Sequence, residues 1–154
     1  MQRVTNCILI ENNHVLLLQK PRRGWYAIPG GKMEHGETIK ESVVREFWEE
    51  TALQLVEPKL GGTFTFNIMD GGKLVQEWMM FTFICRTYQG TLTDHCDEGE
   101  LEWVPIERIS KLPMAEGDRK IFRHLLTSSS MLFGAFTYTE SYELLEARMD
   151  PSSN

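Results

Sequence analysis

The chain has 154 residues, which favours a single domain, and its 42% hydrophobic and 25% charged residues are typical of a globular protein with its own core. The net charge of −6 argues against a protein that binds the backbone of a nucleic acid or an anionic membrane. The three cysteines are widely spaced, which indicates neither a disulfide framework nor a zinc site and favours the reducing cytoplasm. We expect no signal peptide and no membrane-spanning segment, because no apolar run is long enough for either.

The apolar periodicity and the turn residues predict strands and helices in alternation. In chain order we expect strands over residues 4–10 and 14–19 joined by a turn at Asn12-Asn13, a basic loop over 20–24, a helix over 38–52, strands over 53–56, 61–68 and 75–88, an acidic loop over 91–100, a strand over 101–104, one helical turn over 106–110, a helix over 116–126 and a strand pair over 131–149. Residues 15–18 are all apolar, so the second strand is expected to lie centrally in the sheet.

Strands that are separated by two helices predict an α/β or α+β domain, with a mixed β-sheet sandwiched between helices. We expect one domain over residues 1–154, with residues 131–150 as a C-terminal hairpin extension. This hairpin is expected either to cover a functional site or to form a dimer contact, so both a monomer and a homodimer remain open.

The helix over residues 38–52 carries clear start and core signals. Thr38 and Glu41 have the spacing of a capping box, in which each side chain accepts a hydrogen bond from the other residue's backbone. Its expected buried stripe recurs every four residues, at Ile39, Val43 and Phe47. Gly30 and Gly31 precede it, and we expect them to let the chain turn where a Cβ atom would obstruct the approach to the helix.

Three carboxylates share one face of this helix, because Glu46, Glu49 and Glu50 are spaced by three and four residues. Such a face is stable if it is well solvated or if it binds a cation, and a hard divalent ion that prefers oxygen ligands is the natural candidate. Arg45 lies four residues before Glu49 and can pair with it to fix its side chain. The alternative is an ordinary solvated acidic helix with surface ion pairs.

The stretch from Gly31 to Leu53 resembles the Nudix box, G-x5-E-x7-R-E-U-x-E-E-x-G-U, in which U is a bulky aliphatic residue. All of its charged positions are matched, by Glu37, Arg45, Glu46, Glu49 and Glu50. Two positions depart from the pattern. Phe47 replaces an aliphatic residue, and Ala52 replaces a glycine that often ends the helix in a left-handed conformation, which costs a non-glycine residue about 1 kcal/mol.

The resemblance implies a Nudix fold and a Mg²⁺-dependent hydrolase, with Mn²⁺ as a substitute metal, that acts on a nucleoside diphosphate linked to another group. The implied metal ligands are Gly31, Glu37, Glu46, Glu49 and Glu50. The implied catalytic residues are Arg45, Glu49, Glu50 and Glu98. The base that activates water would be Glu49, Glu50 or Glu98. Glu98 is included because relatives place an acid just before a strand like the one that contains Trp103. The alternative to a catalytic role for Glu98 is that it is an acidic loop residue that faces solvent.

Less specific sequence features, almost entirely outside the box, resemble those of the MutT-type branch. Its members are the 8-oxo-dGTP diphosphatases that sanitise the nucleotide pool and so assist DNA repair. They lie in residues 25–31, 101–105 and 112–118. The implied substrate contacts are Arg23, Trp25, Tyr26, Gly31, Lys32, Glu116 and Asp118. Structural alternatives exist for several of them: Trp25 and Tyr26 could pack under the sheet, and Glu116 and Asp118 could simply favour the positive end of the following helix.

Two other functions remain open at this point. The first is a Nudix enzyme that acts on ADP-ribose or on dinucleoside polyphosphates. The second is a Nudix-like domain that senses a nucleotide without catalysis, which the complete set of box acids disfavours. In each case the expected partner is a small nucleotide, and neither a nucleic-acid polymer nor a membrane is expected.

Overall fold

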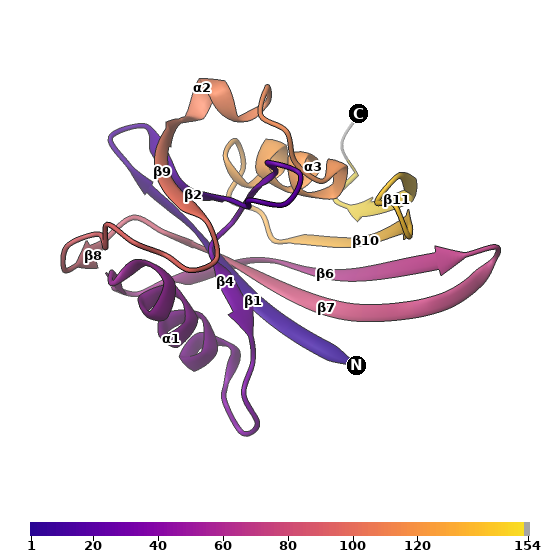
Figure 1. Ribbon diagram of the computed structural model, residues 1–154, viewed down its shortest axis with the longest axis horizontal. Coiled ribbons are helices and arrows are strands. Elements are labelled where there is room, and N and C mark those ends of the chain that lie inside the picture. Colours follow the sequence, from indigo (N-terminus) through magenta and orange to yellow (C-terminus); the bar gives the residue numbers. More distant parts are fainter. Residues whose placement is uncertain (153–154) are drawn as a thin grey trace.

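The computed structural model describes residues 1–152 and is organised around one sheet of nine strands (Figure 1). The strands are β1 (Gln2–Glu11), β2 (His14–Gln19), β3 (Tyr26–Ala27), β4 (Gly30–Lys32), β5 (Gln54–Leu55), β6 (Lys59–Asp70), β7 (Lys73–Cys85), β8 (Tyr88–Gln89), β9 (Glu100–Pro105), β10 (Leu132–Thr139) and β11 (Leu144–Asp150). The helices are α1 (Ile39–Thr51), α2 (Ile106–Ile109) and α3 (Glu116–Leu125). None of the helices within residues 1–152 combines the length and the apolar character needed to cross a membrane.

The sheet mixes parallel and antiparallel pairs, as the sequence predicts. Its strands follow the order β11-β10-β6-β7-β1-β2-β3, with β4 also paired to β1 and β9 to β2. β1 runs parallel to β7 and β10 runs parallel to β6, whereas the other neighbours are antiparallel. The central position expected for β2 is confirmed, because its residues 15–18 are fully buried.

Two segments differ from the sequence predictions in how they pair, and other strands differ by one or two residues at their ends, as does β6, which was expected over residues 61–68. The strand expected over residues 75–88 begins at Lys73 and ends at Cys85, and β8 then pairs with β5 in a separate two-stranded sheet. Gly30 and Gly31, expected at a turn, instead belong to β4 and pair with β1. Local sequence patterns could not show either pairing, because both depend on partner strands that are distant in the chain.

Helix α1 begins and ends as the sequence predicts. Both hydrogen bonds of the capping box between Thr38 and Glu41 are present. At the other end Ala52 has a left-handed conformation with φ 64°, and its N–H donates to the carbonyl of Trp48 at 2.8 Å. The helix therefore ends in the usual geometry although no glycine is present, and α1 carries the associated backbone strain.

Two apolar clusters fill the two faces of the sheet. On one face α1 buries Val43 and Phe47 against β1 and β7, while Ile39 is only partly buried. On the other face α3 buries Ile121 and Phe122 in a cluster with the aromatic residues of β6 and β10. Figure 1 shows the two helices on opposite sides of the sheet. Each fully buried side chain of this size contributes roughly 1.5–3 kcal/mol.

The expected C-terminal hairpin is formed by β10 and β11. β10 pairs in parallel with β6 over eight residues, and it adds Phe136 and Tyr138 to the core beneath α3. The hydroxyl of Tyr138 accepts a hydrogen bond from the N–H of Gly117 at 2.7 Å. A Cβ atom at Gly117 would overlap with this hydroxyl, so the hairpin and the start of α3 fit together closely.

Candidate functional site

The site is built where β4 meets α1. A Cβ atom at Gly30 would overlap with the backbone carbonyl of Thr5 in β1, and a Cβ atom at Gly31 would overlap with the carboxylate of Glu46. The expected obstruction by a Cβ atom is confirmed at Gly31, which faces Glu46 of α1, whereas the expected turn is wrong because both glycines lie in β4. The result is that the carboxylate of Glu46 lies directly against the backbone of β4.

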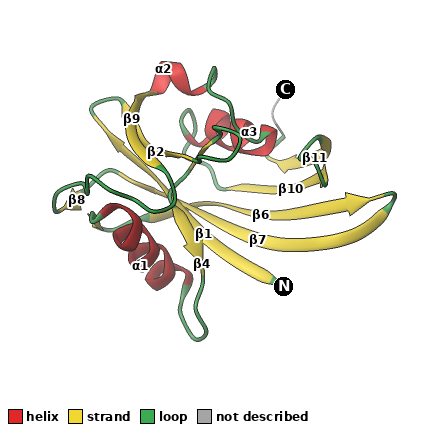
Figure 2. Cartoon of the chain, viewed as in Figure 1, coloured by secondary structure: helices red, strands yellow, loops and turns green. Residues whose placement is uncertain are grey.

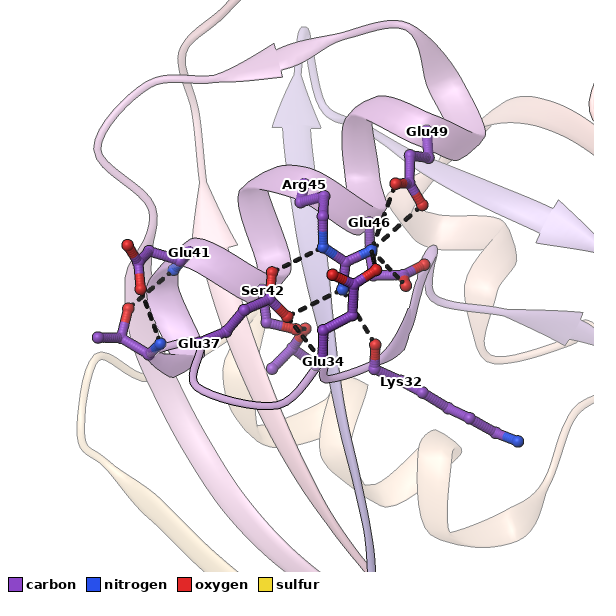
Figure 3. A network of polar contacts seen from close by, with 10 residues as sticks. Lys32, Glu34, Glu37, Glu41, Ser42, Arg45, Glu46 and Glu49 are labelled. Carbon is purple, nitrogen blue, oxygen red and sulfur yellow. Dashed lines mark hydrogen bonds and ion pairs between the residues drawn. The ribbon is translucent and has the colours of Figure 1, made fainter.

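Arg45 is at the centre of a network of carboxylates (Figure 3). Its guanidinium binds both oxygens of Glu37, at 2.6 and 2.9 Å. The same group reaches Glu46 at 2.8 Å and Glu49 at 3.2 Å, and Glu34 at 3.5 Å. The expected pair between Arg45 and Glu49 is therefore present, but the bidentate partner of Arg45 is Glu37.

This network changes the ionisation of its members. Hydrogen bonds from Arg45 lower the pKa of Glu37 to about 2. The bonds to Glu37, and then those to Glu46, raise the pKa of Arg45 above its usual range. Glu37 also accepts a hydrogen bond from the backbone N–H of Glu34 at 2.7 Å. Both oxygens of Glu37 therefore accept hydrogen bonds, and Glu37 orients Arg45, while its expected role as a metal ligand stays a prediction.

Glu50 occupies a different environment on the same helix. Its carboxylate accepts a hydrogen bond from the N–H of Gly30 at 2.9 Å. Burial raises the pKa of Glu50 to about 7, and repulsion by Glu98 and Glu46 adds to this, while the Gly30 N–H and the charge of Lys20 oppose it. The Lys20 ammonium lies 4.0 Å from the Glu98 carboxylate. Glu98 is thus brought from a distant loop towards the glutamates of α1.

The donor chemistry fits a hard divalent cation. Glu46 and Glu50 are adjacent to the backbone of β4, and three carboxylates repel one another around Glu50. A cation that takes oxygen ligands would relieve this repulsion. Within residues 1–152 no group of three or more His, Cys, Asp or Glu side chains is arranged to enclose a metal. In Figure 3 the carboxylates of Glu46 and Glu49 both contact the guanidinium of Arg45.

The residues expected to bind substrate are divided between three places. Lys32 lies in β4, its carbonyl accepts from Arg45 at 3.2 Å, and its side chain points away from the network (Figure 3). Tyr26 is buried in the core beneath α3, with its hydroxyl 3.2 Å from Glu102, so the packing alternative describes it best. Arg23 and Trp25 lie against Tyr142 in the turn between β10 and β11.

Glu116 and Asp118 both lie in the first turn of α3 but differ in environment. Glu116 is exposed and pairs with Arg119 at 3.2 Å, which agrees with a structural role. Asp118 faces Tyr138, and burial raises the pKa of its carboxyl to about 7. No hydrogen bond within the described chain offsets this burial. The two acids of the first turn therefore differ in exposure and in hydrogen bonding.

The sequence reasoning missed one polar residue on the same face of the sheet. Asn6 is buried in β1, and its amide nitrogen contacts the sulfur of Met80 at 3.2 Å. Its side-chain oxygen has no hydrogen-bond partner within residues 1–152. Buried amide oxygens are usually satisfied, so Asn6 has a free acceptor. The available signal was an amide residue inside an otherwise apolar strand.

A matched pair of glycine substitutions tests this geometry. Gly30→Ala places a methyl group against the backbone of β1, so we expect a loss of about 3 kcal/mol in the free energy of unfolding. In Gly31→Ala the added methyl group contacts only the end of the flexible Glu46 side chain. We therefore expect near-normal stability, but a displaced Glu46 carboxylate and reduced activity. Thermal unfolding and activity assays of both variants check this. Equal melting temperatures for the two variants would contradict it.

Two cavities lie outside the carboxylate network. One, of about 800 Å³, is formed by the start of β6, the end of β7 and the segment that follows α3, and includes Lys59 and Arg86. The other, of about 390 Å³, is formed by the loop that precedes β9, including His95 and Cys96. The lining of both, as far as the chain is described, excludes the α1 glutamates. The candidate site is therefore defined by its charged groups.

Comparisons with known proteins show the family to which this chain belongs. A family model described as the NUDIX domain matches residues 1–125. A Nudix hydrolase of Bacillus subtilis is 50% identical over 151 residues, which cover 98% of this chain and 96% of that protein. A crystal structure of a MutT protein from Bacillus halodurans has 51% identity and a TM-score of 0.97, and the match covers 99% of this chain and 100% of that one. An ADP-ribose pyrophosphatase of Methanocaldococcus jannaschii is 33% identical over 108 residues, covering 68% of this chain and 62% of that protein.

Proposed function

The chain belongs to the Nudix hydrolase family, and we propose that it hydrolyses a nucleoside triphosphate to the monophosphate and pyrophosphate. The proposed substrates are oxidised purine nucleotides such as 8-oxo-dGTP, so that the enzyme would sanitise the nucleotide pool. Nudix hydrolases generally use divalent metal ions, and here we propose Mg²⁺, which prefers carboxylate oxygens and phosphate groups. The observation that carries the proposal is the common face of Glu46, Glu49 and Glu50, with Glu98 nearby.

The protein would contribute mainly position and charge to this reaction, as in other phosphoryl transfers. Bound Mg²⁺ supplies charge neutralisation of the phosphates and a lower pKa for bound water. Glu46, Glu49 and Glu50, together with the carbonyl of Gly31, would hold it. Arg45 would keep Glu46 and Glu49 oriented, since its guanidinium already contacts both. Such orienting partners commonly change metal affinity or activity by about 10- to 100-fold.

We assign the base that accepts the proton of the attacking water to Glu98. Its side chain is 61% exposed, which leaves room for a water molecule and a substrate phosphate. The Lys20 ammonium, 4.0 Å away, would also attract a phosphate oxygen. Glu98 lies outside α1, so proton transfer and metal binding would use different carboxylates.

We place the purine of the substrate beside Asp118. A carboxyl with a pKa of about 7 is present in both forms at neutral pH, so it can donate or accept a hydrogen bond at a purine edge. The free acceptor of Asn6 lies on the sheet face that α3 covers, and Trp78 stacks on Phe66 at 5.1 Å on the same face. These groups offer the mixture of aromatic surface and few polar atoms that suits a base.

ADP-ribose is the second candidate substrate, because the relative from Methanocaldococcus jannaschii that shares 33% identity is an ADP-ribose pyrophosphatase. Hydrolysis of ADP-ribose would use the same carboxylates as hydrolysis of a nucleoside triphosphate. The two substrates differ in the group beyond the diphosphate. The charged network alone therefore does not choose between the two. Because both substrates carry a purine, Asp118 would separate them only through the base edge, oxidised guanine against adenine.

A substrate screen tests the proposal directly. Purified protein with Mg²⁺ should release pyrophosphate from 8-oxo-dGTP faster than from dGTP, and EDTA should abolish the release. Phosphate-specific and chromatographic assays would compare these with ADP-ribose and dinucleoside polyphosphates. Turnover of ADP-ribose alone would reassign the substrate, and turnover of none would indicate a domain that only binds nucleotides.

A further inference from the structure

Three side chains tie the basic loop over residues 20–24 to the C-terminal hairpin. The guanidinium of Arg23 lies 5.1 Å from the ring centre of Trp25 and 5.2 Å from that of Tyr142. The two rings meet edge to face with centres 6.2 Å apart, and Arg23 also donates to the carbonyl of Ser141 at 3.2 Å. We call Arg23, Trp25 and Tyr142 the clasp. It joins parts of the chain that are 118 residues apart.

The backbone supports the clasp on both sides. Arg23 and Tyr142 both have left-handed conformations, with φ 71° and 66°, which side-chain-bearing residues rarely adopt without compensating contacts. The basic loop is closed by a hydrogen bond from the N–H of Lys20 to the carbonyl of Trp25 at 2.8 Å. Gln19 donates to Gly24 at 3.1 Å and closes it a second time. The loop is therefore closed by two hydrogen bonds and is held to the hairpin by the clasp.

This loop connects the two halves of the proposed site. At one end the Lys20 ammonium lies 4.0 Å from the carboxylate of Glu98. At the other end Tyr142 lies 5.8 Å from Tyr138, ring centre to ring centre, and the hydroxyl of Tyr138 is held by the start of α3 beside Asp118. The clasp thus links the carboxylates that would act on the phosphates to the residue proposed for the purine.

We propose that Tyr142 is a positioning residue that sets nucleotide affinity, by holding the basic loop between the phosphate side and the purine side of the site. This rests on the proposed function. The proposed role of Tyr142 gives the C-terminal hairpin a function at the site, although β10 and β11 lie beyond the residues 1–125 that the family model matches. Figure 2 shows the hairpin of β10 and β11 beside α3.

Tyr142→Ala tests the proposal, with two matched variants. The Tyr142→Ala variant loses the cation–π contact with Arg23. It should therefore bind a non-hydrolysable dGTP analogue about fivefold more weakly and show a similarly raised KM, with kcat nearly unchanged. Tyr142→Phe keeps the ring and should behave as the wild-type protein does. Phe133→Ala removes another exposed aromatic ring of the same hairpin, outside the clasp, and should also be silent.

Limited trypsin digestion gives a readout that needs no substrate. Cleavage after Arg23 should be about fivefold faster in Tyr142→Ala than in the wild-type protein, because the guanidinium is released from the clasp. Analogue binding by Tyr142→Ala that equals wild type would overturn the proposal, as would an equal loss in Phe133→Ala. Wild-type binding without turnover would instead refute the proposed function and leave the clasp supported by the binding difference.

Discussion

Glu50→Gln is expected to lower kcat by about 1,000-fold while the fold remains intact. The amide of glutamine can still accept the hydrogen bond from the N–H of Gly30 that Glu50 accepts at 2.9 Å. It lacks the negative charge that would hold Mg²⁺. Because burial raises the pKa of Glu50 to about 7, the ionised carboxylate is unfavourable in the folded state, and the neutral amide removes this cost. The melting temperature should therefore stay equal or rise.

The control for this variant is Glu57→Gln. Glu57 is an exposed glutamate beyond the end of α1, and its carboxylate lies 3.5 Å from Lys40. Its replacement removes one charge without touching the proposed metal face, so kcat and stability should both remain close to wild type. Steady-state kinetics with Mg²⁺ and thermal unfolding of both variants give the comparison. Full activity of Glu50→Gln would remove Glu50 from the metal site.

Arg45→Met should reduce both stability and activity, the latter by about 10- to 100-fold. Its guanidinium contacts Glu37, Glu46 and Glu49, and without it these carboxylates would face one another uncompensated. Methionine preserves much of the side-chain volume, so lost charge rather than lost packing should dominate. The matched control is Arg86→Met. Arg86 is an exposed arginine that lines the cavity of about 800 Å³, outside the carboxylate network.

The stability effect of Arg45→Met should depend on pH in a defined direction. Arg45 lowers the pKa of Glu37 from 4.5 to about 2 in the folded protein. A lowered folded-state pKa contributes stability that is fully present above pH 4.5 and is lost as the pH falls towards 2. The difference in melting temperature between wild type and Arg45→Met should thus be largest near neutral pH and shrink in that window. A difference that is constant from pH 7 to pH 3, measured in EDTA, would contradict the role of Arg45.

The helix that carries the carboxylates could be predicted because its signals are local. Thr38 and Glu41 define its start within four residues, and the spacing of Glu46, Glu49 and Glu50 places them on one face whatever the rest of the chain does. The left-handed end at Ala52 was indicated by the resemblance to the Nudix box, which has a glycine at this position. These features need no knowledge of tertiary contacts.

Features that depend on distant partners could not be predicted. Nothing in the residues around Gly30 shows that β4 pairs with β1, and the glycines were therefore expected at a turn. Arg45 was expected to pair with Glu49, whereas the loop before α1 brings Glu37 into the better bidentate position. The contact of Arg23 with Tyr142 depends on the full sheet, since it joins the first and last parts of the described chain.

The parallel pairing of β10 with β6 has a consequence for biosynthesis. During translation the N-terminal part of the chain emerges first, and β6 and β7 can form their hairpin before β10 has been made. Until then β6 presents an open row of backbone N–H and C=O groups along one edge, which is a template for association with other chains. The last strands therefore protect the nascent protein from aggregation as well as completing its sheet.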